Sequence, residues 1–326
     1  MLASLLLGCQ AAGDGSVAAS SVSVNAISPV STVTATFTPL PSLTATPTAT
    51  FTPTPTPFVC SNQRGRTVAD AFSSTAMQEE IRYLVHLPPC YDYYQDKVFP
   101  VLYLLHGWPL DEYHWVDLGI TEIADKWISQ GLVGPFIIVL PGVVNSEGLY
   151  VYSSGGPNSF EGMFVEELRP LVEKTYRTWR SPEGRAVGGI SRGGVWALEI
   201  GLRHPEFFDI VGGHSPALSV NHPLPAYDPF VLAEAGAPGQ RVYLDAGDSD
   251  WTRAGVIRLR DLFLEKDADI TYQLHEGGHV DALWQLGLPD YLIFYTHTWP
   301  DSFVSLPDWI ENPEEVWLED SNFDLR

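Results

Sequence analysis

The stretch that decides the fold is residues 185–194, which read RAVGGISRGG. It contains a Gly-x-Ser-x-Gly motif at Gly189, Ser191 and Gly193. A serine in this motif sits on a sharp turn between a strand and a helix, and glycines beside it avoid the clashes that side chains would cause there. The apolar residues ahead of the serine predict a short buried strand, and residues 195–202 predict a helix. The stretch therefore predicts a serine nucleophile on a strand–helix turn.

Strand and helix signals alternate on both sides of this turn. Short apolar runs predict strands, and apolar residues at helical spacing predict the helices between them. The expected strands are 66–73, 80–87, 98–105, 136–140, 185–190, 209–211, 241–244 and 270–274, and the further expected helices are 120–130, 160–177, 253–266 and 281–295. This order predicts a mostly parallel central sheet with helices on both faces, preceded by two strands that could be antiparallel. Ligands of such sheets bind at the carboxyl ends of the strands.

A serine hydroxyl becomes a good nucleophile when an imidazole accepts its proton and a carboxylate orients that imidazole. In this architecture the order along the chain is serine, acid, histidine. His279 follows the last predicted strand and precedes the last predicted helix, and Gly277 and Gly278 allow a tight loop before it. His275 lies near the end of the same strand and is the competitor. We predict that His279 is the base.

The candidate acids lie in residues 243–250, which read YLDAGDSD and leave the preceding strand. Asp245, Asp248 and Asp250 cluster there. Asp250 could instead cap the helix that follows, and the cluster lacks the glycine and distal glutamate of an EF-hand calcium loop. Spacing alone does not choose between Asp248 and Asp250.

Acyl transfer also needs two backbone N–H groups that point at the negative charge developing on the substrate oxygen. One comes from the residue after the nucleophile, here Arg192. The other comes from the loop after an earlier strand. Residues 104–108, LLHGW, end such a strand, so the N–H of Trp108 is the candidate.

The chain begins MLASLLLGCQ, an apolar run that ends at Cys9. The run is similar to the signal segment of bacterial lipoproteins, in which the cysteine carries the lipid. No Lys or Arg precedes it, although a secretory signal needs a positive start, and a true start further upstream would explain this. We predict a lipoprotein-type signal segment at 1–9 with lipidation at Cys9. The alternative is a tail with a chance cysteine.

Residues 10–57 are predicted to be a disordered linker. Of the 26 residues from 32 to 57, 11 are Thr, 6 are Pro and none is charged. Such a segment buries too little apolar surface to offset its chain entropy, and proline keeps it extended. It would hold a domain away from a membrane, and it could also be an O-glycosylated stalk. The expected location is extracytoplasmic, either lipid-anchored at the cell surface or secreted.

The predicted catalytic domain covers 58–326 and ends in an acidic extension. The whole chain has 18 Lys and Arg against 40 Asp and Glu, a formal charge of -22. This acidity argues against nucleic acid or anionic lipid as partners, because both attract positive charge. Cys60 and Cys90 suggest one disulfide in an exported chain. The cysteines lack metal-type spacing, and we expect neither a metal nor a cofactor.

Together these residues resemble the esterase D family of α/β-hydrolases. That family includes feruloyl and acetylxylan esterases, S-formylglutathione hydrolase, enterochelin esterases and mycolyltransferases. The resemblance covers most of residues 66–295. Its marks are YLVHLPPCY at 83–91, YLLHG at 103–107, VLP at 139–141, ELRP at 167–170, GISRGG at 189–194 and HPEFF at 204–208. Cys90 departs from the pattern, because the family usually has glycine there.

The resemblance implies an α/β-hydrolase fold. It selects Asp250, because the acid of the family stands three residues after a glycine, here Gly247. It also matches the histidine of the family to His279 and the second oxyanion donor to Trp108.

The resulting hypothesis is an exported serine carboxylic-ester hydrolase that works through an acyl-enzyme, with acyl or feruloyl esters of carbohydrates as substrates. The membrane would be a partner only through the lipid anchor. An acyltransferase to a sugar or another alcohol is one alternative, and a catalytically inactive surface binding module is another. The aromatic residues Trp108, Trp115, Tyr150 and Tyr152 in the surrounding loops predict an aromatic cleft.

Overall fold

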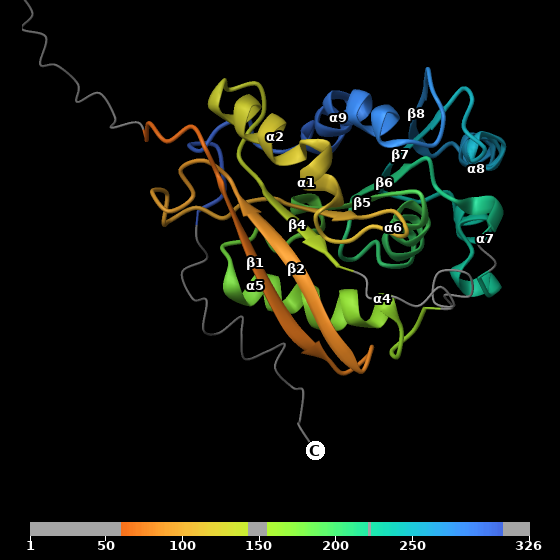
Figure 1. Ribbon diagram of the computed structural model, residues 1–326, viewed down its shortest axis with the longest axis horizontal. Coiled ribbons are helices and arrows are strands. Elements are labelled where there is room, and N and C mark those ends of the chain that lie inside the picture. Colours follow the sequence, from red (N-terminus) through yellow and green to blue (C-terminus); the bar gives the residue numbers. More distant parts are fainter. Residues whose placement is uncertain (1–59, 143–154, 221–222, 309–326) are drawn as a thin grey trace, which may run out of the picture. The chain divides into compact units, whose positions relative to one another are not determined.

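The computed structural model describes residues 60–142, 155–220 and 223–308 (Figure 1). The predicted signal segment, the linker and the acidic tail beyond residue 308 lie outside these ranges. The described residues form an eight-stranded sheet in the order β1-β2-β4-β3-β5-β6-β7-β8. The strands are β1 (Arg66–Ser74), β2 (Glu79–Leu87), β3 (Val101–Leu105), β4 (Ile137–Pro141), β5 (Arg185–Ile190), β6 (Ile210–His214), β7 (Arg241–Gly247) and β8 (Asp269–His275). β2 pairs antiparallel with both β1 and β4, and the remaining pairs are parallel.

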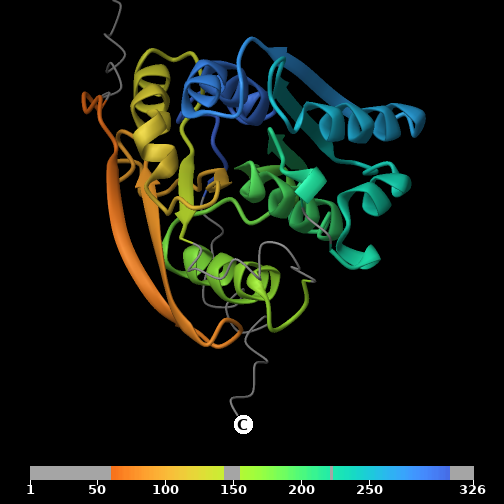
Figure 2. The same ribbon diagram turned by 45° about the vertical axis from the view of Figure 1, so that its right-hand side comes forward.

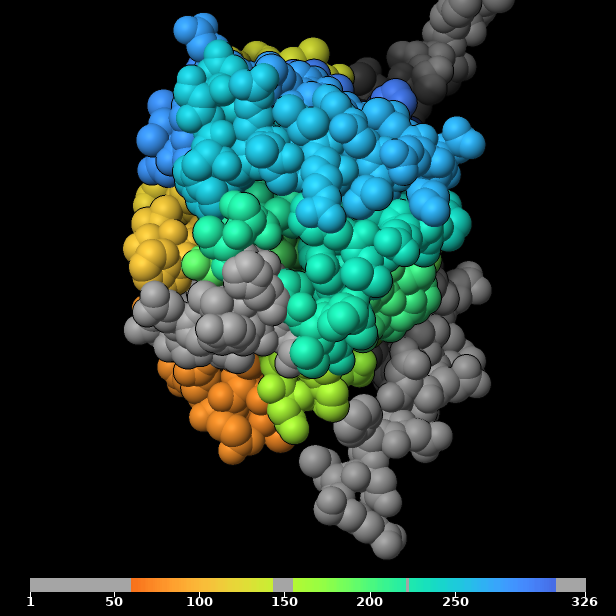
Figure 3. All heavy atoms as spheres, turned by 90° about the vertical axis from the view of Figure 1, so that its right-hand side faces the viewer, coloured from red at the N-terminus to blue at the C-terminus, as the bar shows by residue number. Residues whose placement is uncertain are grey.

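Helices cover both faces of the sheet, as the alternating pattern predicts (Figures 1 and 2). Their bounds are α1 (His114–Leu118), α2 (Ile120–Ser129), α4 (Phe160–Gly162), α5 (Arg169–Thr175), α6 (Arg192–Arg203), α7 (Pro229–Leu232), α8 (Arg253–Glu265) and α9 (Asp281–Thr296). One hydrophobic cluster joins the sheet to α4, α5, α6 and α8, and a second joins the opposite face to α1, α2 and α9. At the β8 end of the sheet, α7 lies beside α8 (Figure 3). The chain therefore has the α/β-hydrolase fold.

The central strands alternate between these two clusters. Val101, Tyr103 and Leu105 of β3 join the first cluster, and Leu102 and Leu104 join the second. A strand with helices on both faces is apolar at every position. This explains why the sequence of β3 reads as a continuous apolar run instead of an alternating one.

Two expected elements differ from the structure. The apolar run 98–105 forms a strand only from Val101, because Pro100 has no N–H to donate to a ladder. Phe99 forms an isolated parallel bridge with Thr178 instead. The expected helix 160–177 contains a π-helical stretch, η1 (Met163–Leu168), between α4 and α5. Apolar spacing does not distinguish a π turn from an α turn over so few residues.

Short elements were not predicted. Besides α1 and α7, these are the 3-10 turns η2 (Pro182–Gly184), η3 (Leu218–Val220), η4 (Pro225–Tyr227) and η5 (Ala233–Ala235). Helices of three to five residues have too few positions to produce a readable apolar period.

Candidate active site

Ser191 lies on the turn between β5 and α6. Its φ is 57°, in the left-handed region that non-glycine residues rarely adopt. Its N–H donates to the carbonyl of His214 at 2.9 Å, which ties the turn to β6. A Cβ at Gly189 would lie 2.2 Å from the carbonyl oxygen of Gly193, and a Cβ at Gly193 would lie 2.4 Å from that of His106. Both motif positions therefore require glycine.

The imidazole of His279 lies between Ser191 and Asp250. Its Nε2 is 2.8 Å from the Oγ of Ser191. Its Nδ1 is 3.0 Å from one carboxylate oxygen of Asp250 and 3.1 Å from the other. The carboxylate can only accept, so Nδ1 carries the proton and Nε2 is left to accept the hydroxyl proton. The structure thus brings the three side chains into the order that a serine nucleophile needs.

Asp250 is buried, and its environment favours the ionised form. Burial acts to raise its pKa, but hydrogen bonds from His279 and from the N–H of Thr252 outweigh burial and lower it. The N–H and hydroxyl of Thr252 both donate to the same carboxylate oxygen at 2.8 Å. Asp250 therefore holds the turn ahead of α8 as well as orienting His279. It is not the helix cap that the sequence offered as its alternative role, because the N-cap residue of α8 is Thr252.

His275 and Asp248, the competing candidates for the base and the acid, have other partners. The Nε2 of His275 is 3.5 Å from the carboxylate of Asp245, which is fully buried between strands. Asp248 is exposed and accepts the N–H of Gly277 at 3.1 Å, a contact that holds the loop before His279. Among the described residues, the hydrogen bonds of His279 go to Ser191 and Asp250, and neither His275 nor Asp248 takes part in them. Geometry thus separates candidates that spacing did not.

The two candidate oxyanion donors flank Ser191. Arg192 is the first residue of α6, and the first N–H groups of a helix have no acceptor within it. Trp108 follows Gly107, and a Cβ at Gly107 would lie 3.5 Å from the Cβ of Ser191. The side chain of His106 is within 2.9 Å of the carbonyl of Gly107, and burial lowers the pKa of His106 to about 4. His106 is therefore neutral and donates from Nδ1 to that carbonyl.

Two exposed tryptophans lie on the segments that carry the site. Trp108 is 45% exposed and Trp251 is 49% exposed. The ring centroid of Trp251 lies 4.8 Å from that of His279. Trp115, which the sequence analysis placed in the aromatic cleft, is instead buried and donates from its indole to the carbonyl of Leu105. Tyr150 and Tyr152 lie outside the described residues.

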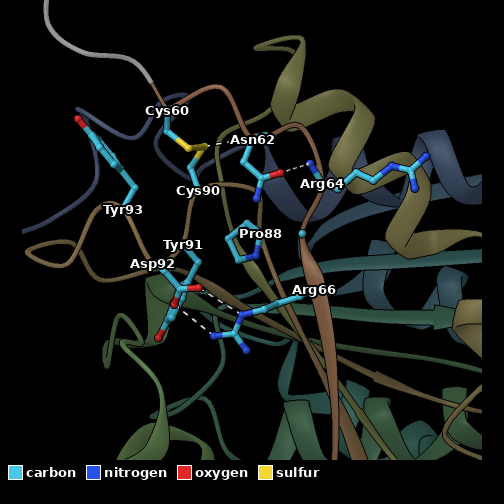
Figure 4. A pocket seen from close by; sticks show the side chains of 10 residues that line it. Cys60, Asn62, Arg64, Arg66, Pro88, Cys90, Tyr91, Asp92 and Tyr93 are labelled. Atoms are coloured by element: carbon cyan, nitrogen blue, oxygen red, sulfur yellow. Dashed lines mark hydrogen bonds and ion pairs between the residues drawn. A yellow bond between two sulfur atoms is a disulfide. The ribbon is translucent and has the colours of Figure 1, made fainter.

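Cys60 and Cys90 form a disulfide with an S–S distance of 2.14 Å (Figure 4). It joins the start of the described chain to the turn that follows β2. Cys90 has a φ of 66°, a conformation that favours glycine. This backbone conformation fits the glycine that the family resemblance implies at this position. In the same region, the guanidinium of Arg66 pairs with Asp92 at 3.2 Å. Cys9 lies outside the described residues.

Within 60–142, 155–220 and 223–308, no group of three or more His, Cys, Asp or Glu side chains has a geometry that could hold a metal ion. No helix in these ranges combines the length and apolar character needed to cross a bilayer.

The fold and the serine–histidine–acid geometry define the chain as an α/β-hydrolase. The family described as "Putative esterase" matches residues 74–295, which is more than half of the chain. The chain belongs to this esterase family.

The chain is also similar to individual known proteins. An endo-1,4-beta-xylanase/feruloyl esterase of Xylanibacter ruminicola is 35% identical over 116 residues, which are 35% of this chain and 16% of that protein. The chain therefore spans a small part of that relative. Among solved structures, a ferulic acid esterase has a TM-score of 0.66 at 24% identity, over 73% of this chain and 99% of that one. An S-formylglutathione hydrolase from Staphylococcus aureus has a TM-score of 0.60 at 14% identity, over 72% and 99%.

Proposed function

We propose that this protein is an exported serine carboxylic-ester hydrolase that acts through an acyl-enzyme on Ser191. The observation that carries the proposal is the 2.8 Å contact between the Oγ of Ser191 and the Nε2 of His279, with Asp250 on the other ring nitrogen. Membership of the esterase family supports the same reaction class. We assign the chemistry to residues 58–326.

In the proposed reaction, the Oγ of Ser191 attacks the ester carbonyl carbon while its proton moves to the Nε2 of His279. The N–H groups of Trp108 and Arg192 would bind the oxyanion. The bond from carbon to the alcohol oxygen then breaks, and the alcohol leaves with the proton from Nε2. In the second half, His279 takes a proton from water while the water oxygen attacks the acyl carbon. The bond from that carbon to Oγ then breaks, the acid leaves, and His279 returns the proton to the Oγ of Ser191.

Export and surface attachment are part of the proposal. The Thr- and Pro-rich stretch at 32–57 and the lipoprotein-like pattern ending at Cys9 support it. The disulfide between Cys60 and Cys90 is also of a kind that persists outside the reducing cytosol.

Hydrolysis and acyl transfer use the same residues and differ in what resolves the acyl-enzyme. We expect hydrolysis of p-nitrophenyl acetate with acetate as the main product. Adding a sugar alcohol at millimolar concentration should leave acetate dominant, because water then remains the better acceptor. Chromatography of the products measures the ratio. An ester of the added sugar as the main product would instead identify an acyltransferase.

Carbohydrate esters are the substrates that we favour. A relative carries the name feruloyl esterase, and Trp251 offers an exposed ring beside His279. The group that protonates the leaving alcohol must lie next to that alcohol. The alcohol side of the substrate would therefore lie against Trp251, where the apolar face of a sugar ring can stack on the indole.

Replacing Trp251 with alanine should raise the KM for a feruloylated sugar about two- to twelvefold, because a stacked ring contributes about 0.5–1.5 kcal/mol. The KM for methyl ferulate should change by less than twofold, because methanol leaves no ring to stack. Steady-state kinetics on both esters gives the comparison, and W251F, which keeps a ring, is the matched control. Equal increases for both esters would contradict this placement of the alcohol.

A further inference from the structure

The peptide unit between Gly107 and Trp108 is held from several directions. Its carbonyl accepts from the N–H of Leu110 at 2.9 Å and from Nδ1 of His106 at 2.9 Å. The preceding N–H, that of Gly107, donates to Nδ1 of His114 at 3.3 Å. Hydrogen bonds on neighbouring peptide groups fix the direction of the N–H of Trp108. This direction matters, because an oxyanion donor works only when it points at the charge that develops.

His114 begins α1 and is held by a residue from a distant part of the chain. Its side chain is 3% exposed, and its Nε2 lies 3.2 Å from a carboxylate oxygen of Asp281. A carboxylate can only accept, so the proton of the neutral ring sits on Nε2 and leaves Nδ1 bare. An Nδ1 without a proton can accept the hydrogen bond that the N–H of Gly107 donates. Burial also lowers the pKa of His114 and outweighs the opposing effect of Asp281. The lowered pKa favours the neutral ring.

Asp281 belongs to the same short segment as the candidate base. It is the first residue of α9 and stands two positions after His279. The ring of His114 packs edge-on against Trp284 of α9 at 5.9 Å, and Trp284 packs edge-on against His279 at 5.0 Å. The start of α9 therefore contacts the imidazole that would move the proton and also His114, which binds the loop that would carry the oxyanion donor.

We infer that His114 is a positioning residue: its ring tautomer, set by Asp281, anchors the N–H of Gly107, and this anchor helps to keep the adjoining Gly107–Trp108 peptide in the orientation needed to stabilise the oxyanion. This inference rests on the proposed function, and it adds a second histidine–aspartate pair that acts on the oxyanion side of Ser191. Ser191, His279 and Asp250 direct the proton transfer, and the pair of His114 and Asp281 directs the donor N–H of Trp108.

Three substitutions at His114 separate this role from packing. In H114N the side-chain oxygen takes the place of Nδ1 and can still accept from Gly107. In H114Q the amide lies closer to the place of Nε2, so it can reach Asp281 but leaves the N–H of Gly107 without its acceptor. H114L removes both contacts. Asn and Gln differ by one methylene, so they are a matched pair.

We expect H114Q and H114L to lower the kcat for an aryl acetate about 30-fold, less than the 10²- to 10³-fold cost of losing a whole oxyanion donor. The KM should stay within about twofold, and H114N should keep kcat within about threefold of the wild type. The affinity for an aryl trifluoromethyl ketone, which forms a tetrahedral adduct with serine, should fall in parallel with kcat. The thermal midpoint of each variant is recorded to separate this effect from unfolding.

NMR of the imidazole nitrogens of the wild-type protein provides a readout that does not depend on activity. The ring of His114 should show a protonated Nε2 and a bare Nδ1. The opposite tautomer would overturn the inference, and so would equal kcat values for H114N and H114Q. A wild-type protein without esterase activity or labelling by a fluorophosphonate would overturn the proposed function itself. An active protein that is insensitive to H114Q would overturn only the inference about His114.

Discussion

Replacing Ser191 with alanine is expected to lower the kcat for p-nitrophenyl acetate about 10⁵- to 10⁶-fold. Alanine has no hydroxyl to form the acyl-enzyme, and the background that remains comes from the oxyanion donors and substrate binding. Ser191 is 7% exposed, and its hydroxyl forms a hydrogen bond with the Nε2 of His279, which belongs to the site and not to the core. The fold should therefore survive the change, with a thermal midpoint close to that of the wild type.

The same substitution should abolish covalent labelling by a fluorophosphonate probe. S302A, in the segment after α9, is the control and should label like the wild type. Mass spectrometry of the labelled protein gives the readout together with the kinetics. Labelling of S191A at the wild-type rate would mean that another residue is the nucleophile. A wild type that neither labels nor hydrolyses esters would favour a binding module that has kept the fold.

The second large effect is expected at Asp250. In D250N the amide can no longer act as a pure acceptor for Nδ1 of His279, so the imidazole loses the tautomer that leaves Nε2 free. Disrupting the tautomer in this way costs about 10⁴-fold in kcat in serine enzymes. The side-chain oxygen of asparagine can still accept from Thr252, so the start of α8 should remain folded.

D248N is the matched control for D250N, because the two acids are two residues apart and carry the same charge. Asp248 touches the loop before His279 and not its ring. We expect kcat to fall less than about fivefold in D248N. A larger loss in D248N than in D250N would reverse the assignment of the acid. Stopped-flow or steady-state hydrolysis of the same aryl acetate serves both variants.

The sequence could predict the parts of the site that depend on local chain geometry. Gly189 and Gly193 surround a serine in a conformation that requires small neighbours, so the turn is readable from its residues. The position of His279 follows from the order of strands and loops. Spacing could not choose between Asp248 and Asp250, because both leave β7 within three residues and only packing decides which one faces the imidazole.

The rest depends on contacts between distant residues. His114 and Asp281 are 167 positions apart, and nothing local marks either as a partner of the other. Trp115 is an aromatic residue close in sequence to the site, so it could be expected to line a cleft. Its side chain points inward instead, and its indole N–H donates to the carbonyl of Leu105. Trp115 also belongs to α1 and not to a loop. An aromatic residue in so short a helix can face the core or the solvent, and its neighbours in the sequence do not specify which.

The disulfide between Cys60 and Cys90 determines how a pulling force enters the domain. Tension applied to the chain ahead of Cys60 passes through the sulfur bridge to Cys90 and on to the chain beyond it. β1 and β2 both lie within the loop that the bridge closes between two cysteines 30 positions apart, so the tension bypasses both strands. Without the bridge, the same tension would reach Arg66 first and could peel β1, an edge strand, away from β2 one hydrogen bond at a time. Reducing the bridge should therefore lower the force at which the domain begins to open.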